Sequence, residues 1–331
     1  MTQEAAMQRV SDALDDVRQI LQDPEGQVSE QHLVSQVLLK RFVGHTGGDA
    51  RRIIPFNLAR PASKQPSKSP KECGKVRDFV KFGSGHLERH VWKPTEDALP
   101  AAFAAVDYGS LFDHPEHVAT IKNVIALHYV RSTQIRDMQR GIWPGIVTNQ
   151  MEWWLGPGAG LLDRGYFLRH GLHPGSIQER RRFVEEMIQP WVDAADAELL
   201  FDARLEWLFE QACVLIGGFG LEILTPARGQ FLIGDVPALT VRHDRLDAGV
   251  RNGIPIGDAN SVVLPLGPRH LAAVGPANQY GTIPVDLRDR LNALQVQEAD
   301  RYVYFQPGSG LEVFVRSQPR FRVVRQPTPG R

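Results

Sequence analysis

The stretch Phe231-Leu232-Ile233-Gly234-Asp235-Val236-Pro237 decides the fold, because the character of the sequence changes close to it. Three apolar residues run into Gly, Asp and Pro, which is typical of a short strand that ends in a constrained turn. Beyond it, apolar runs separated by turn residues predict further strands, interrupted by a helical stretch at 287–299. The predicted strands are 231–233, 238–241, 261–266, 270–274, 301–305 and 311–315.

Before Gly220, apolar residues recur at helical spacing instead. Residues 7–21 carry such a stripe, and Pro115 is placed to open a long helix to about residue 140. Helices first and strands later, without βαβ alternation, predict an α+β fold: a mainly helical N-terminal two-thirds with a small antiparallel sheet in the C-terminal third. We expect an N-terminal appendage helix (1–26), a mainly helical part (27–220) and a β-rich part packed on the same core (221–331).

Composition narrows the class of protein. The chain has 331 residues, and 38 basic side chains balance 38 acidic ones. No apolar run approaches the roughly 18 residues of a membrane span, which argues against an integral membrane protein. The acidic first thirty residues do not resemble a secretory signal, and Cys73 and Cys213 are too few for a disulfide framework. We therefore expect a globular cytoplasmic protein without membrane contact.

Charge is unevenly distributed along the chain. Residues 59–81 hold seven basic and two acidic residues, including five of the eight lysines. Such a patch favours nucleic acid or another phosphate-bearing ligand, with Lys64, Lys68, Lys71 and Lys75 as substrate-binding candidates. The alternative is a solvated loop, because residues 62–70 are rich in proline and serine. A homodimer contact through the N-terminal helix is a further expectation.

A series of segments occurs in a characteristic order: 31–42 (QHLVSQVLLKRF), Asp78-Phe79 with Glu88 and Glu96, 126–132 (ALHYVRS), 231–237 (FLIGDVP), 263–266 (VLPL), and Asn292 with 299–304 (ADRYVY). Together they resemble an uncharacterised, largely bacterial family catalogued as domain of unknown function 4238. Ser35 stands where that family usually has proline, and His128 where it usually has glutamine. The resemblance implies a shared fold and a candidate site, without an established reaction.

Four ionisable residues that lie among apolar residues of these segments, His32, Glu96, Arg131 and Asp235, are our catalytic candidates. Each also has a structural interpretation. His32 can satisfy a local backbone group, Glu96 can meet a helix dipole, and Asp235 can form an Asx turn. Arg131, beside an apolar helix stripe, needs a counter-charge that Glu96 or Asp235 can provide. His128 and Asn292 are added as substrate-binding candidates.

Two functions follow from this set. In the first, Asp235 and Glu96 hold Mg²⁺ or Mn²⁺ beside His32 and Arg131, as in a metal-assisted phosphodiester hydrolase of the nuclease kind. In the second, the protein is a non-enzymatic interaction or regulatory module, and the same residues form a structural ion-pair network. Elsewhere, the pairs His86/His90 and His114/His117 have metal-ligand spacing, although capping or surface exposure is the commoner role of such histidines.

Overall fold

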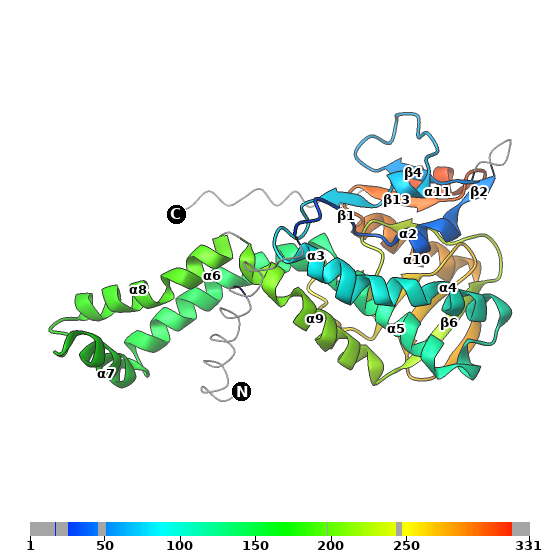
Figure 1. Cartoon of the computed structure of the whole chain (residues 1–331). Coiled ribbons are helices and arrows are strands. Elements are labelled where there is room, and N and C mark those ends of the chain that lie inside the picture. The colour runs from blue at the N-terminus through cyan, green and yellow to red at the C-terminus, as the bar shows by residue number, and fades with distance from the viewer. Residues whose placement is uncertain (1–16, 18–25, 46–50, 197, 243–246, 320–331) are drawn as a thin grey trace. The chain divides into compact units, whose positions relative to one another are not determined.

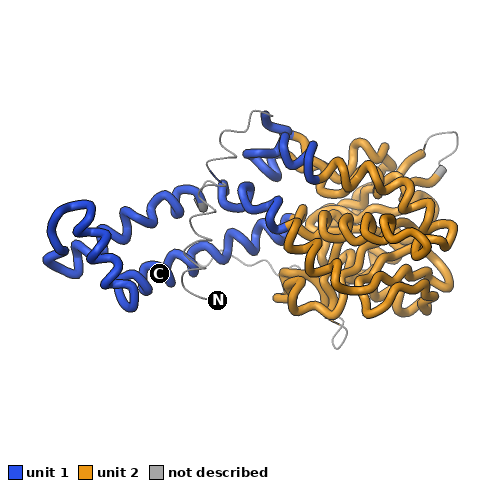
Figure 2. The backbone as a smooth tube through the Cα atoms, turned by 60° about the horizontal axis from the view of Figure 1, so that its bottom comes forward, with its two compact units in different colours: residues 1–29, 78–91, 133–208 blue, residues 30–77, 92–132, 209–331 orange. Residues whose placement is uncertain are grey.

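The chain changes from mainly helices to mainly strands near Gly217 (Figure 1). The computed structural model describes residues 17, 26–45, 51–196, 198–242 and 247–319. Helices dominate up to that glycine and strands after it, so the predicted α+β class is confirmed. The chain forms two compact units (Figure 2): unit 1 comprises residues 1–29, 78–91 and 133–208, and unit 2 comprises 30–77, 92–132 and 209–331.

Unit 2 is built on a six-stranded sheet with the strand order β12-β6-β11-β10-β8-β9. Every neighbouring pair is antiparallel except β12 and β6, which run parallel. The sheet is therefore larger than predicted, and it is mixed rather than purely antiparallel, because one of its strand pairs is parallel. The strands are β6 (Gly220–Pro226), β8 (Leu239–Arg242), β9 (Asp247–Ala248), β10 (Ser261–Pro265), β11 (Leu271–Gly275) and β12 (Gln279–Ile283).

A second sheet joins the N-terminal and C-terminal segments of unit 2. In it β13 (Tyr302–Phe305) lies between β4 (Ile54–Asn57) and β7 (Ile233–Gly234). Helix α10 (Val285–Glu298) is buried against both sheets through Leu291, Leu294 and Val296. Two small ribbons complete the strands: β1 (Glu30–His32) with β5 (Lys75–Arg77), and β2 (Gly44–His45) with β3 (Arg51–Arg52).

The segment predicted as a last strand, 311–315, is instead helix α11 (Leu311–Ser317). Leu311 and Val315 are buried, whereas Val313 between them is 75% exposed. A half-buried strand would bury alternate residues, so the i, i+4 burial identifies a helix.

The helices of unit 2 that precede its six-stranded sheet include α2 (Gln36–Leu39), α4 (Lys93–Tyr108), α5 (Pro115–Val130) and the second half of α9 (Leu199–Gly217). Helix α4 packs along α5 (Figure 1). The long helix predicted from Pro115 to residue 140 is interrupted, because Arg131 leaves helical geometry with ψ of 48°. The chain resumes as α6 at Thr133.

Unit 1 is helical in its described part. Its helices are α3 (Ser84–His86), a π-helix (Leu87–Trp92) whose last residue enters unit 2, α6 (Thr133–Leu155), α7 (Ala159–His170), α8 (Ile177–Asp196) and the first half of α9 (Leu199–Gly217). α6 and α8 pack together, with α7 between them in sequence. The expected appendage helix and its dimer contact lie outside the described residues, except for Val17, which is buried beside Ala194 and Leu200. No described helix has the length and apolar character to cross a membrane.

Candidate functional site

The end of α5 carries the most buried charged side chain of the candidate set. Arg131 caps this helix: its N–H donates to the Leu127 carbonyl at 2.9 Å, and its side chain is 1% exposed. Burying a guanidinium is unfavourable unless its charge and its hydrogen bonds are satisfied. The surroundings of Arg131 therefore decide what this part of the molecule does.

Glu96 supplies the counter-charge of Arg131. Arg131 Nη2 donates to Glu96 Oε1 at 2.8 Å, and the Glu96 side chain is 23% exposed. The guanidinium carbon also lies 4.9 Å from the centroid of the Trp92 ring, at cation–π distance. Glu96 lies in the first turn of α4, where the helix dipole adds favourable interaction with a carboxylate. This is the pairing that the structural interpretation of Arg131 predicts.

Two histidines lie within electrostatic range of this pair. His128 is fully buried one turn before Arg131, and burial, with the positive charge of Arg131, lowers its pKa well below the usual range. Burial also lowers the pKa of the half-buried His32, helped by Lys75 and Arg131 and opposed by Glu96. The Nε2 atoms of Gln36 and His32 are 3.0 Å apart, so the amide donates to a neutral ring. Both imidazoles are therefore uncharged at neutral pH.

The Arg131 cluster, as we name His32, Trp92, Glu96, Arg131 and His128, is incompletely hydrogen-bonded. Among the described residues, Trp92 Nε1, Arg131 Nε and both ring nitrogens of His128 have no hydrogen-bond partner. The Leu33 backbone lies beside the His128 ring without hydrogen-bonding geometry. Buried polar atoms in proteins are nearly always paired with protein or water. These atoms offer mainly donors, which suit a buried water or a small polar ligand.

Asp235 has a different environment. Its carboxylate accepts three backbone hydrogen bonds, Oδ1 from Asp300 N at 2.8 Å and Oδ2 from Arg301 N and Tyr302 N at 2.9 Å each. Within the described structure, it makes no hydrogen bond or ion pair with His32, Glu96 or Arg131. Burial and the Asp300 carboxylate raise the pKa of Asp235 to about 6, against the three N–H groups, which favour the ionised form.

Two amides of α10 hold the same motif from its other side. Asn292 accepts from Leu232 N and donates to the Gln230 carbonyl, each at 3.0 Å. Gln295 accepts from Gly234 N at 2.8 Å and donates to the Pro237 carbonyl at 2.9 Å. We call Asp235, Asn292 and Gln295 the Asp235 clamp. Every side-chain polar atom of the clamp is hydrogen-bonded to backbone, so the clamp has the geometry of residues that hold the local structure in place.

Gly234 shows why the clamp needs this sequence. A Cβ added there would lie 3.0 Å from the Gln295 carbonyl oxygen and 3.3 Å from Ala299 Cβ, so any other residue would require α10 to shift slightly. The substrate-binding role predicted for Asn292 and the metal-binding role predicted for Asp235 remain hypotheses. The structure brings Glu96, Arg131, His128 and His32 together, and it uses Asp235 and Asn292 elsewhere.

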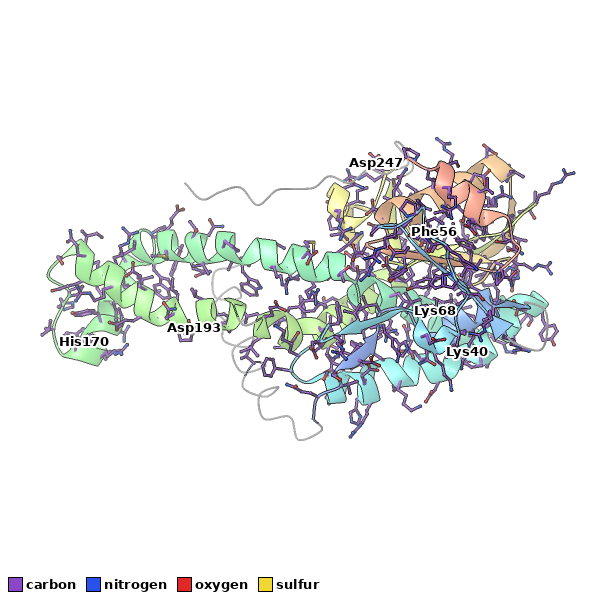
Figure 3. All side chains as sticks on the ribbon, turned by 90° about the horizontal axis from the view of Figure 1, so that it is seen from above. Lys40, Phe56, Lys68, His170, Asp193 and Asp247 are labelled. Carbon is purple, nitrogen blue, oxygen red and sulfur yellow. The ribbon has the colours of Figure 1, made fainter. Side chains whose placement is uncertain are left out.

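The four lysines predicted to bind phosphate are all exposed. Lys75 forms an ion pair with Glu30 at 2.9 Å, whereas Lys64, Lys68 and Lys71 form none with any described residue. Lys71 lies in a short helical turn that packs against α2. Lys40, which directly follows α2, is also exposed, and Figure 3 labels it together with Lys68.

Two residues of these clusters escaped the sequence analysis. Trp92 precedes Glu96 by four residues, a spacing that puts both on one helical face, but a lone tryptophan is usually core. Gln295 follows Asn292 by three residues within an apolar helix, and that pairing of amides at i, i+3 is the signal that could have indicated a clamp.

An ion pair at the end of α5, and an amide-and-carboxylate clamp between α10 and the β7 segment, are the two polar clusters of this α+β protein, both in unit 2. The family model described as protein of unknown function (DUF4238) matches residues 30–309. The chain therefore belongs to this family, as the resemblance implied. No curated protein and no solved structure matches the chain.

Proposed function

We propose that this protein is a non-enzymatic interaction module that binds nucleic acid through its basic surface, with the Arg131–Glu96 pair serving the stability of the fold. The observation that carries the proposal is the set of exposed, unpaired cations on residues 51–77. This segment contains eight basic residues and one acidic residue. Lys64, Lys68 and Lys71 within it are free to contact phosphates.

The segment is anchored, which separates it from an ordinary solvated loop. Gln65 accepts from Asn57 N at 2.9 Å and donates to the carbonyls of Arg60 and Ser63, also at 2.9 Å. Lys68 and Ile53 exchange two backbone hydrogen bonds, of 2.8 and 3.0 Å. A fixed backbone lowers the entropy lost when several lysines bind one polymer.

Glu72, the one acidic residue of the segment, is already engaged. It forms a reciprocal capping box with Ser69, in which Ser69 N donates to Glu72 Oε2 at 2.9 Å. Its carboxylate therefore serves the local turn. The positive potential of the neighbouring lysines is left for an external anion, and polymeric phosphate suits a row of cations better than a single small anion does.

The hydrolase hypothesis has less support from geometry. Asp235 accepts three backbone N–H groups and Glu96 is paired with Arg131, so each proposed metal ligand already has protein partners. A phosphodiesterase of this kind needs carboxylates that converge on one ion. We therefore favour binding without cleavage.

The test is fluorescence anisotropy of a labelled 20-nucleotide single strand with the full chain, from 50 to 200 mM salt. The variant carries Lys64→Ala, Lys68→Ala and Lys71→Ala, and the matched control carries Arg164→Ala, Arg181→Ala and Arg182→Ala, three exposed cations of unit 1. We expect the lysine variant to bind at least about tenfold more weakly, with a salt slope smaller by about 0.7 for each phosphate that is no longer neutralised. The control should match the wild type.

Three results would overturn the proposal. Two concern binding: its absence in the wild type at 50 mM salt, and an equal loss of it in both triple variants. The third is cleavage of the strand with Mg²⁺ or Mn²⁺ that Asp235→Asn abolishes while the variant stays folded, which would return the hydrolase hypothesis.

A further inference from the structure

Three metal-ligating side chains meet at the start of α5, away from the basic segment in sequence. The ligand atoms of His114, Glu116 and His117 all lie within 4.8 Å of one another. His114 Nδ1 is 3.5 Å from Glu116 Oε1, and the two imidazole centroids are 5.2 Å apart. Among the residues that the structure describes, no other group of three or more His, Cys, Asp or Glu side chains meets this distance criterion.

The backbone beneath these side chains is fixed at several points. His114 is the N-cap of α5, and its carbonyl accepts from His117 N at 3.0 Å and from Val118 N at 3.1 Å. Pro115 occupies the first helical position, where its restricted φ suits the helix. One rigid turn thus presents the three ligands.

The turn that precedes His114 is held by a separate strand. Leu111 N donates to the Tyr280 hydroxyl at 2.9 Å, and Phe112 packs edge-to-face on the Tyr280 ring at 4.9 Å. His114 N in turn donates to the Leu111 carbonyl at 3.1 Å. The backbone that carries the three side chains is therefore held in place by contacts with β12. A metal site requires such preorganisation.

The donor set selects a class of ion. Two imidazoles and one carboxylate are ligands for Zn²⁺ and similar divalent transition metals, and three protein ligands leave room for water. With bonds of about 2.0 Å, tetrahedral coordination places neighbouring ligand atoms roughly 3.3 Å apart. The 3.5 Å between His114 and Glu116 already fits this spacing.

We propose that His114, Glu116 and His117 bind one divalent transition-metal ion of the Zn²⁺ class, with water completing its coordination. The negative charge of Glu116 offsets the unfavourable positive end of the helix dipole. The proposal does not depend on nucleic-acid binding.

The chain contains a natural comparison. His86 and His90 also lie side by side, with ring centroids 5.0 Å apart, and His86 Nε2 contacts Glu206 at 3.1 Å. Their group does not bring three ligand atoms within 4.8 Å of one another. A variant of this pair removes two histidines while leaving the proposed site intact.

The experiment titrates the full chain with Zn²⁺ by calorimetry and with Co²⁺ by visible absorption. We expect one ion per chain and a Co²⁺ spectrum of low-coordinate nitrogen and oxygen ligation. His114→Ala with His117→Ala should abolish both signals, and Glu116→Gln should weaken binding at least about tenfold. His86→Ala with His90→Ala should leave both unchanged.

Circular dichroism confirms that each variant is folded before titration. The proposal is overturned if the wild type takes up neither ion, or if the His86/His90 variant loses as much binding as the His114/His117 variant. It is also overturned if Glu116→Gln binds as tightly as the wild type, because the ion would then rest on histidines alone.

Discussion

The Asp235 clamp and the Arg131 cluster are two buried polar groupings of the same unit, and they differ in how completely their atoms are bonded. Each side-chain oxygen and nitrogen of Asp235, Asn292 and Gln295 makes a hydrogen bond to a backbone group. In the Arg131 cluster one ion pair is made, and four polar atoms of Trp92, His128 and Arg131 lack a described partner.

The difference shows how a purely structural polar network can be distinguished from a binding site. A fully bonded polar network fixes one backbone arrangement and offers nothing to a ligand. A partly bonded one is either hydrated or a place where another molecule completes it. A charged residue in an apolar motif is therefore insufficient evidence for a catalytic or binding site. Asp235 and Arg131 share that sequence pattern, but their surroundings in the structure differ.

The largest effect should come from breaking the buried ion pair. Glu96→Gln leaves the charge of Arg131, which is 1% exposed, without a carboxylate, and we expect a loss of about 3–5 kcal/mol in the free energy of unfolding. Urea unfolding followed by circular dichroism measures it. The matched control is Glu312→Gln, which removes an exposed i, i+4 partner of Arg316 and should cost under about 0.5 kcal/mol.

A double variant completes this test. Glu96→Gln with Arg131→Met replaces the stranded charge by an apolar side chain and should recover much of the lost stability. If Glu96→Gln costs no more than Glu312→Gln, the pair does not support the fold, and the structural role proposed for it is wrong.

A smaller effect is expected at the clamp. In Asp235→Asn an amide NH₂ faces a backbone N–H, so an exposed or partly buried donor loses its acceptor, at a cost of about 1 kcal/mol at pH 7. Asp258→Asn, at an exposed aspartate, is the control. Urea unfolding of both variants beside the wild type measures the difference.

The same variant tests the raised pKa of Asp235. Because the folded pKa, about 6, lies above the unfolded value, the folded state binds the proton more tightly, and this contribution is full below about pH 4 and lost as the pH rises through 6. The stability gap between wild type and Asp235→Asn should therefore narrow by about 2 kcal/mol from pH 4.5 to 7. A gap that widens with pH would show that the three N–H groups outweigh burial and depress the pKa.

Sequence periodicity identified the strands whose residues are apolar on both faces. The runs at 238–241, 261–266 and 270–274 became β8, β10 and β11 because each is buried along its length. Strand β12 could not be predicted, since Gln279, Tyr280 and Thr282 are exposed and its parallel pairing with β6 gives no local signal. Helix α11 was missed because five apolar-rich residues fit either period.

The candidate site was predicted in part for a similar reason. Arg131 beside an apolar stripe indicated a buried counter-charge, and Glu96 is that partner. The role of Asp235 depends on the backbone of residues 300–302, more than sixty positions along the chain, and no local pattern encodes that interaction. Function remains a proposal, because the sequence offers residue types, whereas binding depends on which of them are left unpaired.

The smallest predicted effect concerns Ser35, the N-cap of α2. Its φ of −50° suits a proline ring, and its N–H donates to no described acceptor, so Ser35→Pro loses no hydrogen bond. We expect a gain of about 0.4–1 kcal/mol, chiefly because proline restricts the unfolded chain. Urea unfolding of the wild type and the variant measures this gain.

Ser35→Ala separates the ring from the hydroxyl, which is buried and has no partner among the described residues. If the hydroxyl is unbonded, alanine should be neutral or slightly stabilising, and proline should exceed it. If both variants lose about 1 kcal/mol, the hydroxyl is bonded to a buried water. That result would favour water, rather than a small polar ligand, as the partner of the unpaired atoms in the Arg131 cluster.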